Sequence, residues 1–491
     1  MSITRNIGIR AGVIVLSLSL AGPAAHAADI FMDDNPSGLG PYDGSSWENA
    51  VRNWTELAAV LAYQDTVHVK EGTYATVGVS LGTWATFLGG YPQANTGTQT
   101  TGRDPVNLRP VLNSDTTNRV LQITTTTVLN GFTIQNGGGV DRGAGINCVG
   151  GDVTIQYCLI QNNSITVGGA AILQDIGGGG LMADTAGTLT VEETTFTNNS
   201  FTSTGGAGGT NNAIIGGGGA RTRRSSTFTR CTFSFNNCNI STAGVGTYRG
   251  GGGGAMVSNP AGTFTFDRCQ FLNNSVATMA NSAQGGGGLW MQSNTGGTHV
   301  TNLTNCYFYN NTSNYYGSAL GGPAQTGHPM TLNAIHCTFD RNPIAVQSNV
   351  ESIRLNQDTA GASSFNFLNC IFSNNTGGNG TGPATIRSST AAGANDVIDN
   401  CLFFGNTAND VNWGTRVTNP VAGADPGISA GNPHISGTNA VDKVPPVTPA
   451  VGDIDCALGS SATRIPNGGL VDVGCDEDAF VPVTLSGFHL E

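Results

Sequence analysis

The sequence is poor in charged and aromatic residues, and this narrows its fold class. Asp, Glu, Lys and Arg make up 11% of the 491 residues, and Phe, Trp and Tyr make up 7%. Helical bundles do not have this composition. Glycine is abundant, at 72 residues, but it does not recur at every third position, which excludes a collagen triple helix. Because Phe, Val, Ile and Leu recur throughout, the sequence is unlike that of a disordered chain. With collagen also excluded, the composition favours a repetitive β architecture.

Cations are particularly scarce. Lys and Arg number 20 against 32 for Asp and Glu, and the formal net charge is −12. A nucleic acid or an anionic membrane binds through an excess of Lys and Arg that displaces counterions. We therefore expect no nucleic-acid partner, and the negative balance serves solubility.

Long hydrophobic runs are also missing. The apolar run from Ala11 to Ala21 falls short of the roughly 20 residues that cross a bilayer, and no later segment reaches that length. Arg5 and Arg10 precede this run and Ala25-His26-Ala27 follows it, which is the pattern of a secretory signal peptide; a transmembrane anchor is the weaker alternative. The prediction is a leader over residues 1–27, cleaved near Ala27. The mature chain would have no transmembrane span and would be secreted or placed on the outer surface of a Gram-negative-type envelope.

One short unit occurs eight times. Its template is an apolar residue, two residues, Cys, any residue, Phe, two residues and Asn, and a weaker ninth copy lies at residues 126–137. The eight copies are VTIQYCLIQNN (153–163), LTVEETTFTNN (189–199), STFTRCTFSFNN (226–237), FTFDRCQFLNN (264–274), VTNLTNCYFYNN (300–311), TLNAIHCTFDRN (331–342), FNFLNCIFSNN (365–375) and DVIDNCLFFGN (396–406). A unit that recurs at this scale is typical of a solenoid.

The spacing inside each unit predicts a strand, a corner and a second strand. Apolar residues alternate on both sides of a three-residue step, such as Phe266 to Cys269, which breaks the period of two and redirects the chain. Asn, frequent at the second corner place, tolerates a left-handed backbone. Glycine tracts such as 216–220 would open a third strand, where neighbouring turns approach closely.

The fold class that follows is all-β: a right-handed parallel β-helix with three strands per coil and an N-terminal capping helix. Like residues then stack one coil above the next. We expect two internal ladders, one of Cys158, Thr194, Cys231, Cys269, Cys306, Cys337, Cys370 and Cys401, and one of Asn163, Asn199, Asn236, Asn274, Asn311, Asn342, Asn375 and Asn406.

The two ends of such a solenoid need covers, because an open end exposes strand edges. Residues 45–63 begin with Ser45 and Glu48 at capping-box spacing and continue with helix formers, and a strand-like segment follows at 66–74. The predicted organisation is therefore a cap with the first coils at 28–115, β-helix repeats at 116–410 and a closing region at 411–491. The closing region contains a last strand-like segment at 469–480.

These motifs resemble a known group of proteins. Glycine tracts that alternate with units ending in Asn, as in GGGGAMVS…CQFLNN and GGGGLWMQ…CYFYNN, are similar to the polymorphic outer membrane protein repeats and related right-handed β-helix proteins of the pectate-lyase-like superfamily. The front portion is similar to caps in which a D-G-S-S-W run precedes a helix. Autotransporter members of the group end in an outer-membrane barrel, and the roughly 80 residues after the repeats are too few for one. The resemblance implies the fold and surface display, while solenoids host many functions.

The cysteines point to structure. Seven share one template place with Thr194, which favours a buried stack over a metal site, and the Cys and His spacing of a zinc site is absent. Cys456 and Cys475, both in the closing region, are the predicted disulfide pair. No glycine tract continues as a phosphate-binding loop, so we expect no cofactor and no metal.

Two interpretations of the function remain open. Arg221, Arg223, Arg224 and Arg230 suggest a patch for an anionic glycan, although solvated outward side chains are the simpler expectation. The carboxylates and histidines fall at different places of the template. They are Asp175, Asp184, Glu193, Asp267, Asp340, Asp399, His299, His328 and His336. Corner residues such as His336 and Arg268 are expected at the surface. We predict a non-catalytic, adhesin-like protein whose loops recognise a glycan or a host or cell-surface partner. The alternatives are a lyase or hydrolase acting on an acidic polysaccharide, and a structural fibre.

Overall fold

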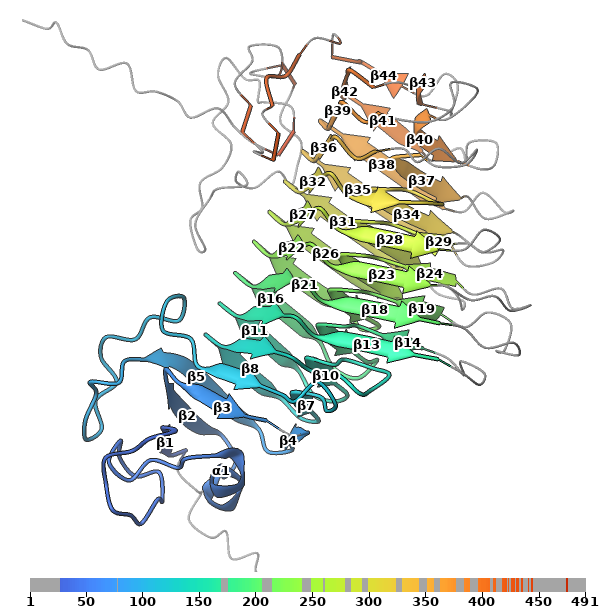
Figure 1. Ribbon diagram of the computed structural model, residues 1–491. Helices are drawn as coiled ribbons and strands as arrows, with labels where there is room; N and C mark the ends of the chain where they lie inside the picture. Colours follow the sequence, from blue (N-terminus) through green and yellow to red (C-terminus); the bar gives the residue numbers. More distant parts are fainter. Residues whose placement is uncertain are drawn as a thin grey trace, which may run out of the picture.

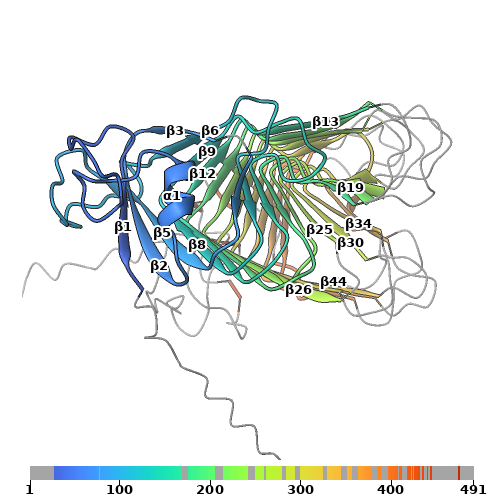
Figure 2. The ribbon, with the colours of Figure 1, turned by 90° about the horizontal axis from the view of Figure 1, so that it is seen from below.

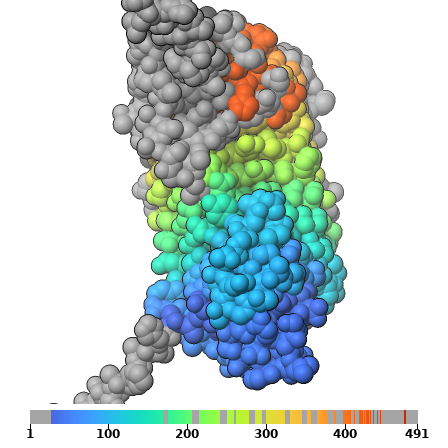
Figure 3. Space-filling view, turned by 90° about the vertical axis from the view of Figure 1, so that its left-hand side faces the viewer, coloured from blue at the N-terminus to red at the C-terminus, as the bar shows by residue number. Residues whose placement is uncertain are grey.

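A computed structural model describes most of the chain (Figure 1). The described residues are 27–168 without 77, 175–204, 214–240, 249–258, 261–278, 284–293, 299–323, 329–343, 351–356, 363–376, 384–388 and 396–406, followed by parts of 409–444 and residues 474–475. All pairs of strands in this part of the chain are parallel, and the colours of Figure 3 follow the long axis in sequence order. The chain is a right-handed parallel β-helix, which confirms the predicted fold class.

Three long sheets form the body of the solenoid, and each turn of the chain adds one strand to each sheet. Sheet A contains β1 (Asp29–Met32), β2 (Asp65–Lys70), β5 (Ala85–Tyr91), β8 (Thr127–Asn130), β11 (Val153–Gln156), β16 (Leu189–Glu192), β21 (Ser226–Thr229), β26 (Gly262–Asp267), β31 (His299–Thr304), β35 (Met330–Ile335), β38 (Ser364–Leu368), β41 (Val397–Asp399) and β44 (Val417–Thr418). Sheet B contains β3 (Thr73–Ala75), β6 (Val111–Asn113), β9 (Thr133–Gln135), β12 (Leu159–Gln161), β17 (Thr195–Thr197), β22 (Thr232–Ser234), β27 (Gln270–Leu272), β32 (Tyr307–Tyr309), β36 (Thr338–Asp340), β39 (Ile371–Ser373) and β42 (Leu402–Phe404). Sheet C contains β4 (Val79–Leu81), β7 (Leu121–Ile123), β10 (Ile146–Cys148), β15 (Leu181–Ala183), β20 (Ala220–Thr222), β25 (Ala255–Ser258), β30 (Leu289–Gln292), β34 (Leu320–Pro323), β37 (Ile353–Asn356), β40 (Ala384–Ser388) and β43 (Asn409–Val411).

The middle coils contain more than the three expected strands. Between sheets B and C the chain makes a side extension with two further parallel sheets (Figures 1 and 2). Sheet E contains β13 (Ser164–Val167), β18 (Ser200–Ser203), β23 (Asn237–Ile240), β28 (Ser275–Thr278) and β33 (Thr312–Ser313); sheet D contains β14 (Ile176–Gly177), β19 (Ile214–Gly216), β24 (Arg249–Gly251) and β29 (Gln284–Gly285). Their facing side chains, among them Phe201 and Ile215, form a second small core. A two-strand extension buries these apolar residues, which three strands would leave exposed.

Corners between sheets A and B have the left-handed backbone expected for them. The second corner residues have φ between 47° and 55°, in the series Tyr157, Glu193, Arg230, Arg268, Asn305, His336, Asn369 and Asn400. Half of this series, the Asn and His residues, tolerates this conformation well. The Tyr, Glu and Arg residues of the other half adopt it although it costs L-residues roughly 1–2 kcal/mol. The register of stacked strands imposes the corner even where the residue does not favour it.

Phenylalanine rings stack through the centre of the coil. Phe196, Phe233, Phe271 and Phe308 occupy one register position of sheet B, and their ring centroids lie 4.8, 4.9 and 4.5 Å apart. All four rings are fully buried. Each coil therefore covers the aromatic ring of the coil before it, and the solenoid buries an apolar surface that no single coil could bury.

A row of asparagines lies beside these rings. Each Oδ1 accepts from the backbone N–H and the Nδ2 of the asparagine one coil earlier, while each Nδ2 also donates to a backbone carbonyl of the coil before. For Asn274 the bonds run to Asn311 Oδ1 at 3.0 Å and to the Phe233 carbonyl at 2.8 Å. The row contains Asn163, Asn199, Asn236, Asn274, Asn311, Asn342, Asn375 and Asn406, and all but Asn406 are fully buried.

The cysteines and Thr194 form a parallel row at the corner. The residue after each of them donates its backbone N–H to the carbonyl of the row member one coil earlier, as Gln270 does to Cys231 and Tyr307 does to Cys269, both at 2.9 Å. Every member is fully buried, in the order Cys158, Thr194, Cys231, Cys269, Cys306, Cys337, Cys370 and Cys401. Burial raises the pKa of Cys158 to about 11, so this thiol stays protonated at neutral pH.

The capping helix is shorter than predicted. α1 (Trp54–Val60) starts after Asn53, whose Oδ1 accepts from the backbone N–H groups of Thr55 and Glu56, both at 3.0 Å. The predicted capping box at Ser45 and Glu48 is wrong, because the Glu48 carboxylate accepts from Gly97 N–H instead. Trp54 and Leu57 of α1 pack into the main core and close its first coil (Figure 2).

Part of the region after the repeats packs against the side of the solenoid. Ile428, Ile435, Ala440 and Val444 pack against Ile371 and Leu402 on the outer face of sheet B. Cys475 is buried beside Tyr307, and its backbone N–H donates to Thr338 Oγ1. Apart from residues 474–475, the strand expected at 469–480 lies outside the described residues. Among the described helices, none combines the length and the apolar character that crossing a membrane requires.

Candidate functional site

Because the ladder residues lie inside the coil, a ligand would bind at the outer faces of the sheets. The structure brings the cysteine, phenylalanine and asparagine rows together inside the coil, where they contact one another and no solvent. Their role is therefore packing. Side chains that face outward from sheets C and E are the candidates for function.

A pocket lies at the last strands of sheet E. It has a volume of about 310 Å³ and is lined by Asn237, Ser275, Val276, Ala277, Thr312, Ser313, Asn314 and Pro343. Among the described residues, the last strand of sheet E is β33, which has two residues and so pairs with only part of β28. The pocket lining combines the apolar residues Val276, Ala277 and Pro343 with residues that carry hydroxyl or amide groups.

The pocket continues a polar surface on the outer face of sheet E. One outward row contains Ser164, Ser200, Asn237, Ser275 and Thr312, and the neighbouring row contains Thr166, Thr202, Asn239, Ala277 and Asn314. The side chains bond along the rows, from Ser200 to Ser164 at 2.8 Å and from Asn237 to Ser275 at 2.7 Å. This surface offers uncharged donors and acceptors at the spacing of the coils.

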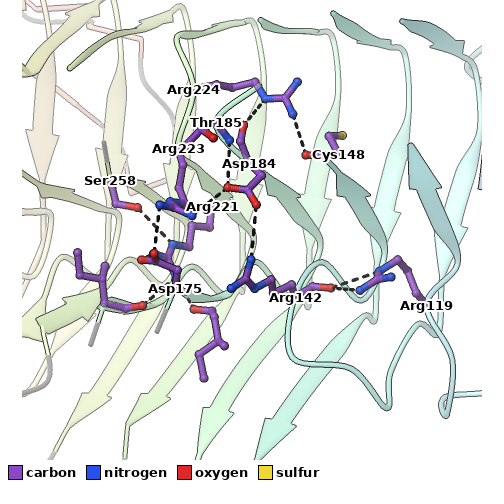
Figure 4. A network of polar contacts seen from close by, with 12 residues as sticks. Arg119, Arg142, Cys148, Asp175, Asp184, Thr185, Arg221, Arg223, Arg224 and Ser258 are labelled. Atoms are coloured by element: carbon purple, nitrogen blue, oxygen red, sulfur yellow. Dashed lines mark hydrogen bonds and ion pairs between the residues drawn. The ribbon is translucent and has the colours of Figure 1, made fainter. Parts of the chain in front are cut away.

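A second candidate is a network of arginines and aspartates on the outer side of sheet C (Figure 4). Arg221, on β20, is fully buried. It donates to the carbonyls of Ile176 and Ile214 at 2.5 and 2.9 Å, to Ser258 Oγ at 3.2 Å, and to Asp175 at 3.1 Å. Burial lowers its pKa to about 10, and Asp175 opposes this effect.

Arg224 holds neighbouring coils together. Its guanidinium donates to the carbonyls of Cys148, Gly151 and Asp184 at 2.7, 2.8 and 2.5 Å, and its exposed fraction is 1%. The expectation that these arginines are solvated is therefore wrong for Arg221 and Arg224. The missed signal is that both follow a glycine tract, where close approach of coils leaves buried carbonyls in need of donors.

The accessible part of the network is small. Arg223 links Asp175 and Asp184, at 3.1 and 2.9 Å, and Arg142 lies 3.5 Å from Asp184. These four side chains are between 21% and 33% exposed. Sequence spacing left Asp175 and Asp184 at unrelated template places, and the stacking of coils brings them to the same arginine. Arg230 is elsewhere, at a corner, where it pairs with Glu193.

Further along the same face, sheet C is covered. Met256 and Trp290, the outward residues of β25 and β30, are almost fully buried against Ile214 of sheet D, with Tyr316 packed beside them. Arg354 lies over the Tyr316 ring at 3.7 Å. These contacts join the side extension to the body of the coil.

The remaining candidate residues do not converge. Asp267 pairs with Arg268, Asp399 bonds to Thr418, and His299 bonds to Thr301 Oγ1. His336 is fully buried and bonds to Asn369, so its predicted exposure at the corner is wrong. Asp340 is also fully buried, and desolvation raises its pKa. His328 lies outside the described residues.

No group of three or more His, Cys, Asp or Glu side chains suited to a metal ion occurs among the residues that the structure describes. The predicted disulfide stays a prediction, because Cys456 lies outside those residues. Cys475 is fully buried beside Tyr307.

Comparisons with known proteins add little beyond the fold. No protein-family model matches the sequence, and no curated protein matches it. Among solved structures, the crystal structure of pectate lyase Pel9A is similar, with a TM-score of 0.44 and 14% sequence identity, covering 92% of this chain and 96% of that chain. The chain is thus a parallel β-helix protein by its own strand pairing, and its function has to be inferred from its own side chains.

Proposed function

We propose that the protein is an exported, non-catalytic β-helix protein that binds a glycan of a surface or partner cell in the pocket at the end of sheet E. The pocket carries the proposal. Its volume, about 310 Å³, falls at the lower end of the range for small-molecule sites, which is roughly 300–1,000 Å³. A lining that combines apolar groups with hydroxyl and amide groups suits a sugar ring, which has an apolar face and a rim of hydroxyls.

The chemistry of the pocket favours binding over turnover. Its lining contains no Asp, Glu, His, Lys or Arg, and glycosidic bond cleavage uses carboxylates or other proton-transfer groups. Uncharged hydroxyl and amide groups bind hydroxyls without protonating them. The proposed ligand is therefore a neutral saccharide, and display on an envelope surface, as in the polymorphic outer membrane protein repeats, is part of the proposal.

The alternative is a polysaccharide lyase, and the arginine network favours it to a degree. The pKa of Arg221 is lowered, and the network around it holds more guanidinium groups than carboxylates. This surplus of cations suits an acidic polysaccharide. However, a catalytic base must touch the substrate, and the Arg221 side chain is fully buried with its donors engaged by carbonyls and Asp175. The pocket is the better-supported site.

The test is a glycan array followed by calorimetric titration of the saccharides that bind. Ala277→Trp places an indole in the pocket from an exposed position, and we expect binding to fall at least tenfold. Thr312→Val removes one hydroxyl, and we expect about a fivefold loss, since a hydrogen bond contributes about 1 kcal/mol. Thr166→Val, at the opposite end of sheet E, is the matched control and should bind like the unaltered protein.

The two functions give opposite results in one further assay. The protein is incubated with polygalacturonate and alginate, with and without Ca²⁺, and new reducing or unsaturated ends are measured. We expect none. Suppose that the protein cleaves one of these polymers, that Arg223→Met abolishes the cleavage and that Ala277→Trp leaves it intact. The lyase function would then replace the binding proposal.

A further inference from the structure

The first residues after the predicted leader make an unusual contact. The backbone nitrogen of Ala28 donates to Asp65 Oδ1 at 2.8 Å. Ala28 directly precedes β1, the edge strand of sheet A, and its carbonyl accepts from Thr66 N–H at 2.9 Å. The nitrogen of residue 28 is therefore held against one carboxylate by the pairing of β1 with β2.

Asp65 is a buried carboxylate that lacks a cation. Its exposed fraction is 2%, and its other oxygen accepts from the backbone N–H of Ala62 at 2.7 Å. None of the ion pairs formed within the described residues includes Asp65. Neighbouring charges are already paired, Asp29 with His68 and Asp33 with Lys70. A buried carboxylate is costly unless a positive charge accompanies it.

Removal of the leader supplies that charge. We infer that cleavage of the Ala27–Ala28 bond creates an α-ammonium at Ala28 that pairs with Asp65 and locks the edge strand of the cap. Water adds across the peptide bond in a reaction catalysed by a leader-specific protease; the carboxylate leaves with residues 1–27, and the Ala28 nitrogen takes up protons to become an ammonium. This inference concerns maturation and depends on the predicted leader, independently of the glycan pocket.

The geometry suits a chain that begins at residue 28. Ala27 and Ala28 are exposed while Asp65 is buried, so the nitrogen reaches the carboxylate from the surface side. Any residue before Ala28 converts the ammonium to an amide and moves the terminal charge by about one residue length, 3.8 Å. Asp65 therefore distinguishes the processed terminus from an unprocessed or misprocessed one.

The pairing predicts a pH dependence with a defined sign. A paired ammonium has a higher pKa in the folded than in the unfolded chain, where the value is about 7.7–8.0. Its contribution to stability is complete below that value and is lost as pH rises through the folded-state value. The other titratable groups on the two paired strands are Asp29 and His68, which bind each other, and Lys70, which pairs with Asp33. Tyr63 lies exposed before β2.

The experiment has two independent parts. Intact mass and N-terminal sequencing of the exported protein should give Ala28 as the first residue, and any other terminus overturns the inference. Purified proteins that begin at Ala28 or at Ala27 are then compared by the rate at which the terminal amine is acylated at pH 8. We expect the amine of the Ala28 form to react at least fivefold more slowly.

Variants identify the carboxylate. Asp65→Asn in the Ala28 form should restore the acylation rate of the Ala27 form, while Asp115→Asn, an exposed carboxylate in a later turn, should change nothing. Equal rates in the Ala28 and Ala27 forms overturn the inference. The comparison of these two forms leaves Asp65 in place, so the result stands even if Asp65→Asn does not fold.

Discussion

The inner rows of phenylalanine and asparagine along sheet B and the outer side of sheet C are built by different rules. Along the first, each residue contacts its own kind one coil away: Phe271 stacks between Phe233 and Phe308, and Asn274 bonds to Asn236 and Asn311. Along the second, unlike residues occupy one register row, as Met182, Arg221, Met256 and Trp290 do. Self-stacking requires the same residue in every coil, whereas unlike partners leave each coil free to differ.

This difference separates structure from candidate function. The inner rows have almost no accessible polar group, and their residues are constrained by both neighbours. The variable side holds the arginine network, the side extension and the pocket, where one coil can change without disturbing the next. A substitution should therefore cost most stability in the inner rows and least where a row already tolerates a different residue.

The largest loss is expected for a ring in the centre of the stack. Phe271→Ala removes a fully buried ring with aromatic neighbours on both sides. Such truncations cost about 3–5 kcal/mol of unfolding free energy. Chemical denaturation measures this; Phe403→Ala, in the last coil and partly exposed, should cost clearly less. Equal losses at both places would show that the stack does not act coil on coil.

The asparagine row gives a matched pair of neighbours. Asn274→Ala removes the acceptor for the Asn236 N–H and the donor to the Phe233 carbonyl, both buried. Because each orphaned group costs about 1–3 kcal/mol, we expect a loss of about 3 kcal/mol. Asn273→Gly removes an adjacent, less buried side chain at a φ of 55° that glycine accepts, and its cost should stay below about 1 kcal/mol. A reversed order in thermal melts would contradict the assigned bonds.

Arg224 and Arg223 test the variable side. Arg224→Met removes the guanidinium that donates to the carbonyls of Cys148, Gly151 and Asp184, and we expect a loss of about 2–3 kcal/mol. Arg223→Met breaks two partly exposed ion pairs and should cost about 1 kcal/mol or less. Raising the salt concentration should narrow the difference between Arg223→Met and the unaltered protein. It should leave the effect of Arg224→Met unchanged, since its partners are uncharged.

Asp340 gives a pH-dependent test at the closing region. Desolvation raises its pKa, so the folded state favours the protonated carboxyl, and this group destabilises the protein as pH rises above the ordinary value of 3.8. Asp340→Asn should therefore increase stability at pH 7, by an amount of the order of 1 kcal/mol, and the gain should vanish below pH 3.8. Urea titrations at several pH values measure it. A variant that is less stable at pH 7 would mean that the ion pair with Arg341 outweighs desolvation.

The smallest change is expected in the cysteine row. Thr194 already occupies one place, and its hydroxyl donates to the Glu192 carbonyl much as the Cys269 thiol donates to the Asp267 carbonyl. Cys269→Thr should cost less than about 1.5 kcal/mol, as volume-conserving changes do. Cys269→Arg at the same position should abolish folding. Similar stabilities for the two variants would place this position at the surface.

Much of the fold could be predicted from the sequence because each feature of the repeat corresponds to a local backbone conformation. These features are the alternation of apolar residues, the three-residue step and the closing asparagine. The stacking of equal residues then follows from the repeat period. The capping helix was placed in the right segment but not at the right start, because Ser45 and Glu48 have the spacing of a cap while Asn53 has the geometry. Local patterns indicate an element and leave its boundary to tertiary contacts.

The side extension and the pocket could not be read in the same way. Their strands are short, and their polar rows have no spacing that distinguishes them from loops. The network of Arg221, Arg223, Asp175 and Asp184 depends on which coils are adjacent and how far each loop reaches, and residues 46 positions apart in the chain meet there.

The amino-acid sequence by itself determined the coil, its interior rows and the places of its corners, since the spacing repeats in each coil and most residues of the interior rows contact a residue of their own kind. Only the tertiary structure decided which arginines are buried, where sheet E ends and which carboxylate faces Ala28. Those features arise from contacts between unlike residues of different coils, and their partners are chosen by distance in space rather than by a period in the chain.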